Sequence, residues 1–219
     1  MSPGGADRRA PPVVIVRVVP WWGVISSAAA PVLLAGGWTL AAGLQPRSVN
    51  AVASTISALA AEGAADRWVM TVALVAVAVC DVVTGLALRP VATPGRLALI
   101  AGGVAGLLVA ANPEPASGGS LTHAFWATIG FIALAGWPAG GWRWGPSVPF
   151  GLRPGVCAAA AGSLLGLLIW FGTELITRGG QVGLAERILT EAQAVWPLAV
   201  VLTCRWARLP RGRPPQAAP

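Results

Sequence analysis

Six long apolar runs restrict the fold of this chain more than any other feature of its sequence. Each run is close to the roughly 20 residues that a helix needs to cross the hydrocarbon core of a bilayer. Hydrophobic residues make up 55% of the 219 residues and charged residues only 11%, whereas soluble domains carry about 25% charge. The predicted spans are 22–44, 68–88, 96–112, 122–140, 154–174 and 190–207. The sequence therefore predicts an all-α integral membrane protein, a six-helix bundle in a lipid bilayer.

The arginines indicate how the chain is oriented in the membrane. All 15 basic residues are arginines, and with both termini cytoplasmic eleven of them fall in inner segments and four in outer ones. This is the positive-inside bias of membrane proteins. Arginine in place of lysine, with abundant alanine and glycine, is typical of a GC-rich bacterial genome, so we expect a bacterial plasma membrane. The predicted segments are a cytoplasmic tail (1–20), a six-span transmembrane domain (21–208) and a basic, proline-rich cytoplasmic tail (209–219).

The composition also argues against several classes of function. The net charge of +7 does not indicate nucleic-acid binding, because the arginines are scattered at span ends and not clustered on one face. The three cysteines lie inside or at the edge of apolar runs and there is a single histidine, so we expect neither a disulfide framework nor a metal site. No glycine-rich phosphate loop is present, and we expect no cofactor.

The stretch from Asn50 to Arg67 lies between the first two predicted spans. At 100° per residue, Asn50, Ser54 and Ser57 fall on one helical face and apolar side chains on the other. Such a segment between two spans lies at the membrane interface and turns its polar face toward a site. We therefore expect a short amphipathic helix in the first outer loop, over 50–62, folded back over the outer mouth of the bundle.

Asp81 is the one acid well inside an apolar run. It lies 13 residues beyond Trp68, or about 20 Å along a helix. A carboxylate at that depth must be paired, hydrated or protonated. Two interpretations stay open: a proton or cation site, or a structural partner for Thr84 or an arginine on the inner side.

The remaining polar side chains gather in the outer layer that this topology predicts. The candidate binding residues there are Ser54, Ser57, His123, Glu174, Glu186, Arg187 and Glu191. Serine, histidine and carboxylates are the ingredients of nucleophilic catalysis, and His123 and Ser57 are the candidates for it, although no G-x-S-x-G sequence is present. A histidine at the head of a span also serves as a hydrogen-bonding cap. Arg187 suits a carboxylate or phosphate headgroup, or an ion pair with Glu62, Asp66 or Glu191.

Small residues recur every four positions in the third and fifth predicted spans. They are Ala98, Gly102, Gly106 and Ala110 in one span, and Ala158, Gly162 and Gly166 in the other. Such ridges let helix backbones approach closely within a membrane. We expect both ridges to form close helix contacts.

Three stretches together resemble one known family. They are the loop QPRSVNAVASTISALAAEGA, the span start LTHAFWATIGF and the last-span entry GLAERILTEAQAVWPL. Over about residues 22–207 the chain is similar to the bacterial and archaeal membrane family DUF998, a domain of unknown function. The T-I-S-x-L element beginning at Thr55, His123 and the Glu186-Arg187 pair carry the resemblance, while Ala58 departs from it because relatives often have an acid there. The resemblance implies a six-helix bundle and a site location, but no activity.

Four functions remain open from the sequence, the fourth being a structural partner of another envelope protein. The first, which we favour, is a non-enzymatic membrane protein that binds a lipid or small amphiphile in an outer-facing polar pocket. The second is a membrane-embedded hydrolase or transferase that uses His123 with a carboxylate. The third is a small proton-coupled transporter that uses Asp81, although transporters usually carry several polar residues at mid-membrane depth.

Overall fold

The computed structural model describes residues 19–207, and this part of the chain is all-α, as predicted. The α-helices are α1 (Trp21–Gly43), α2 (Ile56–Ala60), α3 (Trp68–Ala87), α4 (Thr93–Ala111), α5 (Leu121–Gly141), α6 (Pro154–Thr177) and α7 (Val182–Trp206). A 3-10 helix, η1 (Phe150–Leu152), precedes α6. The predicted tails lie outside the described residues, except for Val19 and Pro20.

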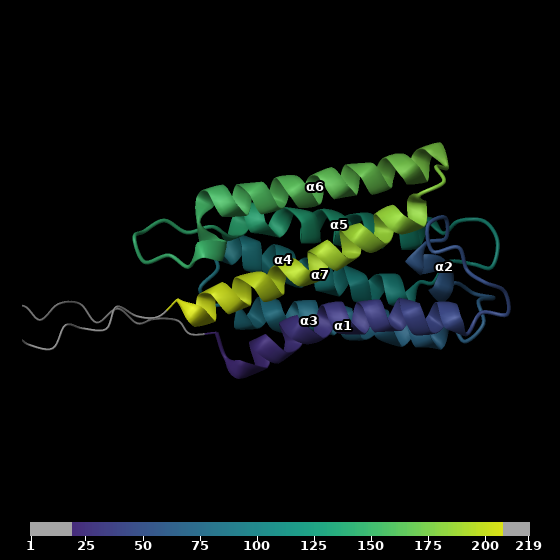
Figure 1. Ribbon diagram of the computed structural model, residues 1–219, viewed down its shortest axis with the longest axis horizontal. Coiled ribbons are helices and arrows are strands. Elements are labelled where there is room, and N and C mark those ends of the chain that lie inside the picture. The colour runs from purple at the N-terminus through teal and green to yellow at the C-terminus, as the bar shows by residue number, and fades with distance from the viewer. Residues whose placement is uncertain (1–18, 208–219) are drawn as a thin grey trace, which may run out of the picture.

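Six long helices run lengthwise side by side, and the short α2 lies at one end of them (Figure 1). The start of α1 and the end of α7 lie together at the opposite end, where Arg205 Nη1 donates to the carbonyl of Val19 at 3.4 Å. With an even number of helices that alternate in direction, the first helix begins and the last helix ends at the same end of the bundle. Figure 1 also shows α7 crossing the bundle diagonally, from the α2 end to the opposite end.

Five helices, α1 and α3 to α6, are long and apolar enough to cross a membrane. They confirm five of the predicted spans and indicate a multi-pass membrane protein. The last helix begins at Val182, whereas the predicted span began at residue 190. The prediction started late because the first turns of the helix carry Glu186 and Arg187 and are too polar to belong to an apolar run. Both of those charged side chains are buried within the protein.

The small-residue ridge of α4 forms the predicted close contacts. A Cβ placed on Gly102 would lie 2.6 Å from the side chain of Leu134 in α5. On its neighbour Gly103, a Cβ would lie 2.7 Å from the carbonyl oxygen of Ala78 in α3. Helix α4 therefore packs backbone-close between α3 and α5, which are its main neighbours.

The prediction of a matching ridge on α6 is wrong. A Cβ placed on Gly162 or Gly166 would meet no atom within 4 Å, and both glycines lie on the exposed face of the helix. Helix α6 packs on α5 and α7 through larger side chains such as Leu164 and Phe171. The small residues of α6 face outward. Four-residue spacing shows that small side chains share one face of a helix, but it does not show whether another helix lies opposite that face.

The loop between α1 and α3 is helical over a shorter stretch than predicted. Within the expected helix 50–62, only Ile56–Ala60 is helical, and the residues before it form turns. Asn50 makes the difference, because its side-chain Oδ1 accepts a hydrogen bond from the backbone N–H of Val52 at 3.0 Å. This local bond competes with a helix. Thr55 then caps α2 by accepting from the N–H of Ala58 at 3.2 Å.

Candidate functional site

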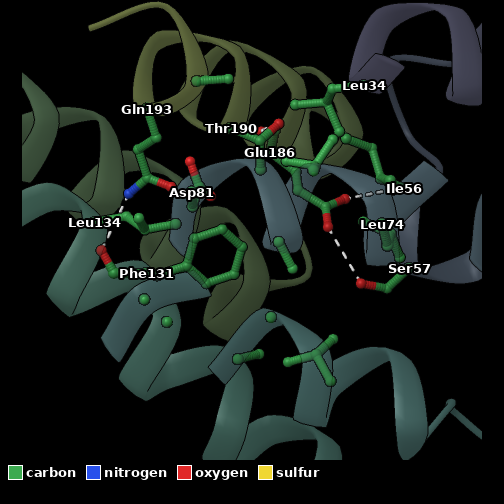
Figure 2. A pocket seen from close by; sticks show the side chains of 18 residues that line it. Leu34, Ile56, Ser57, Leu74, Asp81, Phe131, Leu134, Glu186, Thr190 and Gln193 are labelled. Carbon is green, nitrogen blue, oxygen red and sulfur yellow. Dashed lines mark hydrogen bonds between the residues drawn. The ribbon is translucent and has the colours of Figure 1, made fainter. Parts of the chain in front are cut away.

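A pocket of about 120 Å³ lies in the centre of the bundle, beneath α2. Side chains from α1, α2, α3, α4, α5 and α7 line it, and most of them are apolar. Its polar side chains are Ser57, Asp81, Glu186, Thr190 and Gln193, which are labelled in Figure 2. Three of the residues selected from the sequence, Ser57, Asp81 and Glu186, thus line one cavity.

Asp81 comes from the middle of α3 and is only 5% exposed. Within residues 19–207 its carboxyl group takes part in no hydrogen bond or ion pair. The structural partners considered for it are engaged elsewhere. Thr84 shares a hydrogen bond of 2.9 Å with Ser26, and Arg96 Nε donates to the carbonyl of Gly85 at 3.1 Å. Asp81 is therefore directed into the pocket without a protein partner.

Glu186 lies in the second turn of α7 and is 3% exposed. One carboxylate oxygen accepts a hydrogen bond from the backbone N–H of Ile56, at the first turn of α2. The other accepts from Ser57 Oγ at 3.3 Å (Figure 2). Because a carboxylate near a helix N-terminus satisfies N–H groups that have no partner within the helix, Glu186 fixes α2 over the pocket.

Arg187 faces away from the pocket and holds the backbone that leads into α2. Its Nη1 donates to the carbonyls of Ala51 at 2.8 Å and Ser54 at 2.7 Å, and to Gly183 in its own helix at 3.0 Å. The structure places it on these carbonyls and on no acid, so the ion pairs considered for it do not form among the described residues. We call Glu186, Arg187 and the segment 51–57 that they bind the loop clamp.

Gly183 allows the loop clamp to close. A Cβ at this position would overlap the carbonyl of Ser54, so only glycine lets the first turn of α7 reach the loop backbone. The N–H of Leu184 also donates to the carbonyl of Val52 at 3.0 Å. Ser54, predicted as a binding side chain, therefore contributes its backbone carbonyl to the clamp.

Thr190 and Gln193 line the pocket but were not among the residues selected from the sequence. Gln193 is 3% exposed and its Nε2 donates to the carbonyl of Phe131 at 3.0 Å, which leaves its amide oxygen available (Figure 2). Thr190 donates to backbone carbonyls one turn below it. A periodicity signal for both was present, because residues 186, 190 and 193 recur at the spacing of one helical face.

His123 is not among the residues that line the pocket with Ser57 and Glu186. Its backbone N–H donates to Ser120 Oγ at 3.2 Å, which caps α5. Its ring Nδ1 lies 2.9 Å from the carbonyl oxygen of Asn112, and its Nε2 lies 3.8 Å from a carboxylate oxygen of Glu114. These contacts tie the head of α5 to the loop that precedes it. Of the two roles considered for His123, this is the geometry of a hydrogen-bonding cap.

Two further acids selected from the sequence also lie outside the pocket lining. Glu174 accepts from the backbone N–H of Gln181 at 2.9 Å and so organises the turn between α6 and α7. Glu191 is partly buried in α7, and one of its carboxylate oxygens has no hydrogen-bond partner among the described residues. No group of three or more metal-ligating side chains comes together within residues 19–207.

Comparison with known proteins gives one match. The model of the family described as "Protein of unknown function (DUF998)" matches residues 27–203. No curated protein and no solved structure matches the chain. The matched residues include the pocket, the loop clamp and His123. The chain therefore belongs to the DUF998 family.

Proposed function

We propose that this protein is a six-span integral membrane protein that binds a small amphiphile in its central pocket. The pocket carries the proposal, because apolar side chains from five long helices surround a few polar groups. A mostly apolar cavity with a few convergent polar groups is the usual form of a small-molecule site. The Glu186 side of the loop clamp holds α2 over this cavity.

We infer that α7 is the sixth span. Its 25 residues would extend about 37 Å, more than the roughly 30 Å of the hydrocarbon core. Its polar side chains Glu186, Arg187 and Gln193 are buried against protein and would not face lipid. In this arrangement α2 is a short helix in the first outer loop, with Ile56 and Leu59 turned inward.

The proposed orientation has both termini in the cytoplasm of a bacterial cell. It places the loop that contains Ser117 outside and the loop that contains Ser147 inside; both residues are exposed. We expect a membrane-impermeant maleimide added to intact cells to label a Ser117→Cys variant in which the native cysteines are replaced by alanine. A Ser147→Cys variant in the same background should be labelled only after permeabilisation. If only the Ser147→Cys variant were labelled in intact cells, the orientation would be opposite to the proposed one.

The volume of the pocket limits the ligand to a small molecule or the headgroup of a larger one. At about 120 Å³ it is somewhat smaller than the roughly 150 Å³ apolar cavity that holds benzene in an engineered lysozyme. Arg187 donates to loop carbonyls and does not line the pocket, so it offers no ready site for an anionic headgroup. A short amphiphile with one polar end suits the cavity best.

A pocket-filling variant tests this function. Trifluorobutanol, trifluorobutylamine and trifluorobutyrate share one apolar body and differ in their polar end, and ¹⁹F NMR can follow each of them with the protein in nanodiscs. We expect at least one probe to bind saturably. Ala127→Leu, which adds volume at the pocket wall, should abolish the saturable signal. Ala124→Leu, on the exposed face of the same helix, should not. If every probe only partitioned into lipid, equally with all three proteins, the proposal would be wrong.

A proton-coupled transporter using Asp81 is the second candidate. One observation favours it: two buried acids, Asp81 and Glu186, line one cavity at different depths of the bundle. The hydrolase alternative has less support. His123 lies beside Glu114, but Ser57, the candidate nucleophile, donates its hydrogen bond to Glu186 and not to that histidine.

A further inference from the structure

We propose that the central pocket selects a small organic cation, a protonated primary amine on a short apolar body, with Asp81 as its counter-charge. The inference rests on the proposed function and specifies its ligand class. It combines three independent observations: the sign of the charges around the cavity, the hydrogen-bonding groups left unused there, and the apolar walls.

The charged groups that line the pocket have one sign. Asp81 enters from α3 and Glu186 from α7, and no arginine or histidine is among the lining residues. Arg187, which follows Glu186 in the sequence, donates to the carbonyls of Ala51 and Ser54. A buried carboxylate without a counter-charge is costly in a membrane protein, so a cation in the cavity would remove a penalty that the chain itself leaves in place.

Asp81 differs from Glu186 because its carboxyl group has no hydrogen-bond partner within residues 19–207. Asp81 is only 5% exposed and its side chain is directed into the cavity. Glu186 differs because Ile56 and Ser57 already donate to it. Asp81 is therefore the acid available to a ligand, and Glu186 contributes the second negative charge.

The hydrogen-bonding capacity left in the pocket consists mainly of acceptors. Gln193 uses its Nε2 on the carbonyl of Phe131 and keeps its amide oxygen. The hydroxyl groups of Ser57 and Thr190 donate to protein acceptors and keep their own lone pairs. An ammonium group has three donors and no acceptor, so it matches such a set. A carboxylate or phosphate, which only accepts, does not.

The walls account for the rest of the ligand. Leu34, Leu74, Val77 and Leu134 present aliphatic surface, and Phe131 presents an aromatic ring. A short alkyl chain would be removed from water against these side chains. A cation near an aromatic face gains further attraction. A four-carbon amine combines this apolar body with the required head.

The experiment compares the three fluorinated probes on the wild-type protein and on Asp81→Asn. We expect trifluorobutylamine, protonated at neutral pH, to bind more tightly than trifluorobutanol, and trifluorobutyrate to bind most weakly. Asp81→Asn should weaken the amine on the order of 30-fold, the usual loss when a buried charge loses its partner, and change the alcohol little. Glu191→Gln, which removes a partly buried acid outside the pocket, should leave all three affinities unchanged.

The possible outcomes separate this inference from the proposed function. Equal binding of amine and alcohol, unaffected by Asp81→Asn, would leave the amphiphile site standing and overturn the cation preference. Tighter binding of the carboxylic acid would overturn it too. Saturable binding of no probe would refute both.

A second measurement uses the wild-type protein and so does not depend on the folding of a variant. A hydrophobic carbodiimide adds covalently to buried carboxyl groups, and peptide mass spectrometry locates the adduct. We expect trifluorobutylamine to lower the amount of carbodiimide adduct on Asp81, and the amine bound there to displace the urea from the activated carboxyl group and leave an amide in its place. Trifluorobutanol at the same concentration should lower the adduct less. Equal labelling of Asp81 with and without the amine would contradict the proposal.

Discussion

Replacing Arg187 with alanine is expected to lower the free energy of unfolding by about 3 kcal/mol. The change removes the donor that serves three backbone carbonyls, those of Ala51, Ser54 and Gly183. A hydrogen bond from a charged group contributes about 1.5–3 kcal/mol, and the three share one guanidinium nitrogen, so their losses will not add fully. Reversible unfolding in detergent measures the change.

Arg178→Ala is the matched control for this prediction. Arg178 is an exposed residue at the C-terminal end of α6, and the structure gives its side chain no hydrogen bond or ion pair within residues 19–207. We expect its removal to change stability by less than about 0.5 kcal/mol. Hydrogen exchange should also rise in 51–57 for the Arg187 variant alone. Equal effects of the two substitutions would mean that the loop clamp does not stabilise the protein.

Gly103→Leu is expected to cost about 3 kcal/mol or more, or to prevent folding. A Cβ on Gly103 would already lie 2.7 Å from the carbonyl oxygen of Ala78 and 2.9 Å from the backbone nitrogen of Val82. Backbone atoms cannot rotate away as the end of a side chain can, so α3 and α4 would have to separate. Overpacking of a well-packed core typically costs about 1–3 kcal/mol, and this contact lies at or beyond the upper end.

Gly162→Leu makes the same chemical change on α6, where no atom lies within 4 Å of the added Cβ. We expect this variant to keep the thermal stability of the wild-type protein in detergent. The pair separates close packing from the general effect of a leucine on a membrane helix, because both glycines lie inside long apolar helices. If Gly103→Leu were tolerated as well as Gly162→Leu, α3 and α4 would not be packed as the structure describes.

The helices were predictable from the sequence because the length of an apolar run is a local property. Five predicted spans agree with α1 and α3 to α6 to within a few residues at each end. The spacing of small residues was less informative, because close packing also depends on which helix lies opposite. The small residues of α4 and α6 have the same spacing, but only those of α4 meet another helix.

The site was predictable in part. The residue types and the assumed topology selected Ser57, Asp81 and Glu186, which line one pocket. They also grouped His123 with that set, whereas its contacts are with Asn112 and Glu114 in the adjacent loop. An expected layer says which side chains share a depth in the membrane but not which helices are neighbours around the bundle.

The contacts of the loop clamp could not be predicted, because they join residues far apart in the chain. Ile56 and Glu186 are 130 residues apart, and Ala51 and Arg187 are 136 apart. Both of these contacts use backbone groups of the loop, which every residue has, so the sequence carries no specific mark of them. The helical periodicity of 50–62 was misleading for a similar reason, since the Asn50 side chain binds its own backbone in a turn.

The same separation in sequence has a consequence for how the protein is made. A ribosome delivers the chain from its N-terminus, so the loop between the first two helices emerges long before Glu186 and Arg187 are synthesised. Until then the N–H of Ile56 and the carbonyls of Ala51 and Ser54 lack the partners they have in the finished protein. In a chain interrupted before Val182, the first helices would be inserted but α2 would lack the hydrogen bonds to Glu186 that hold it over the pocket. Only a chain that includes α7 can therefore close the cavity with these contacts.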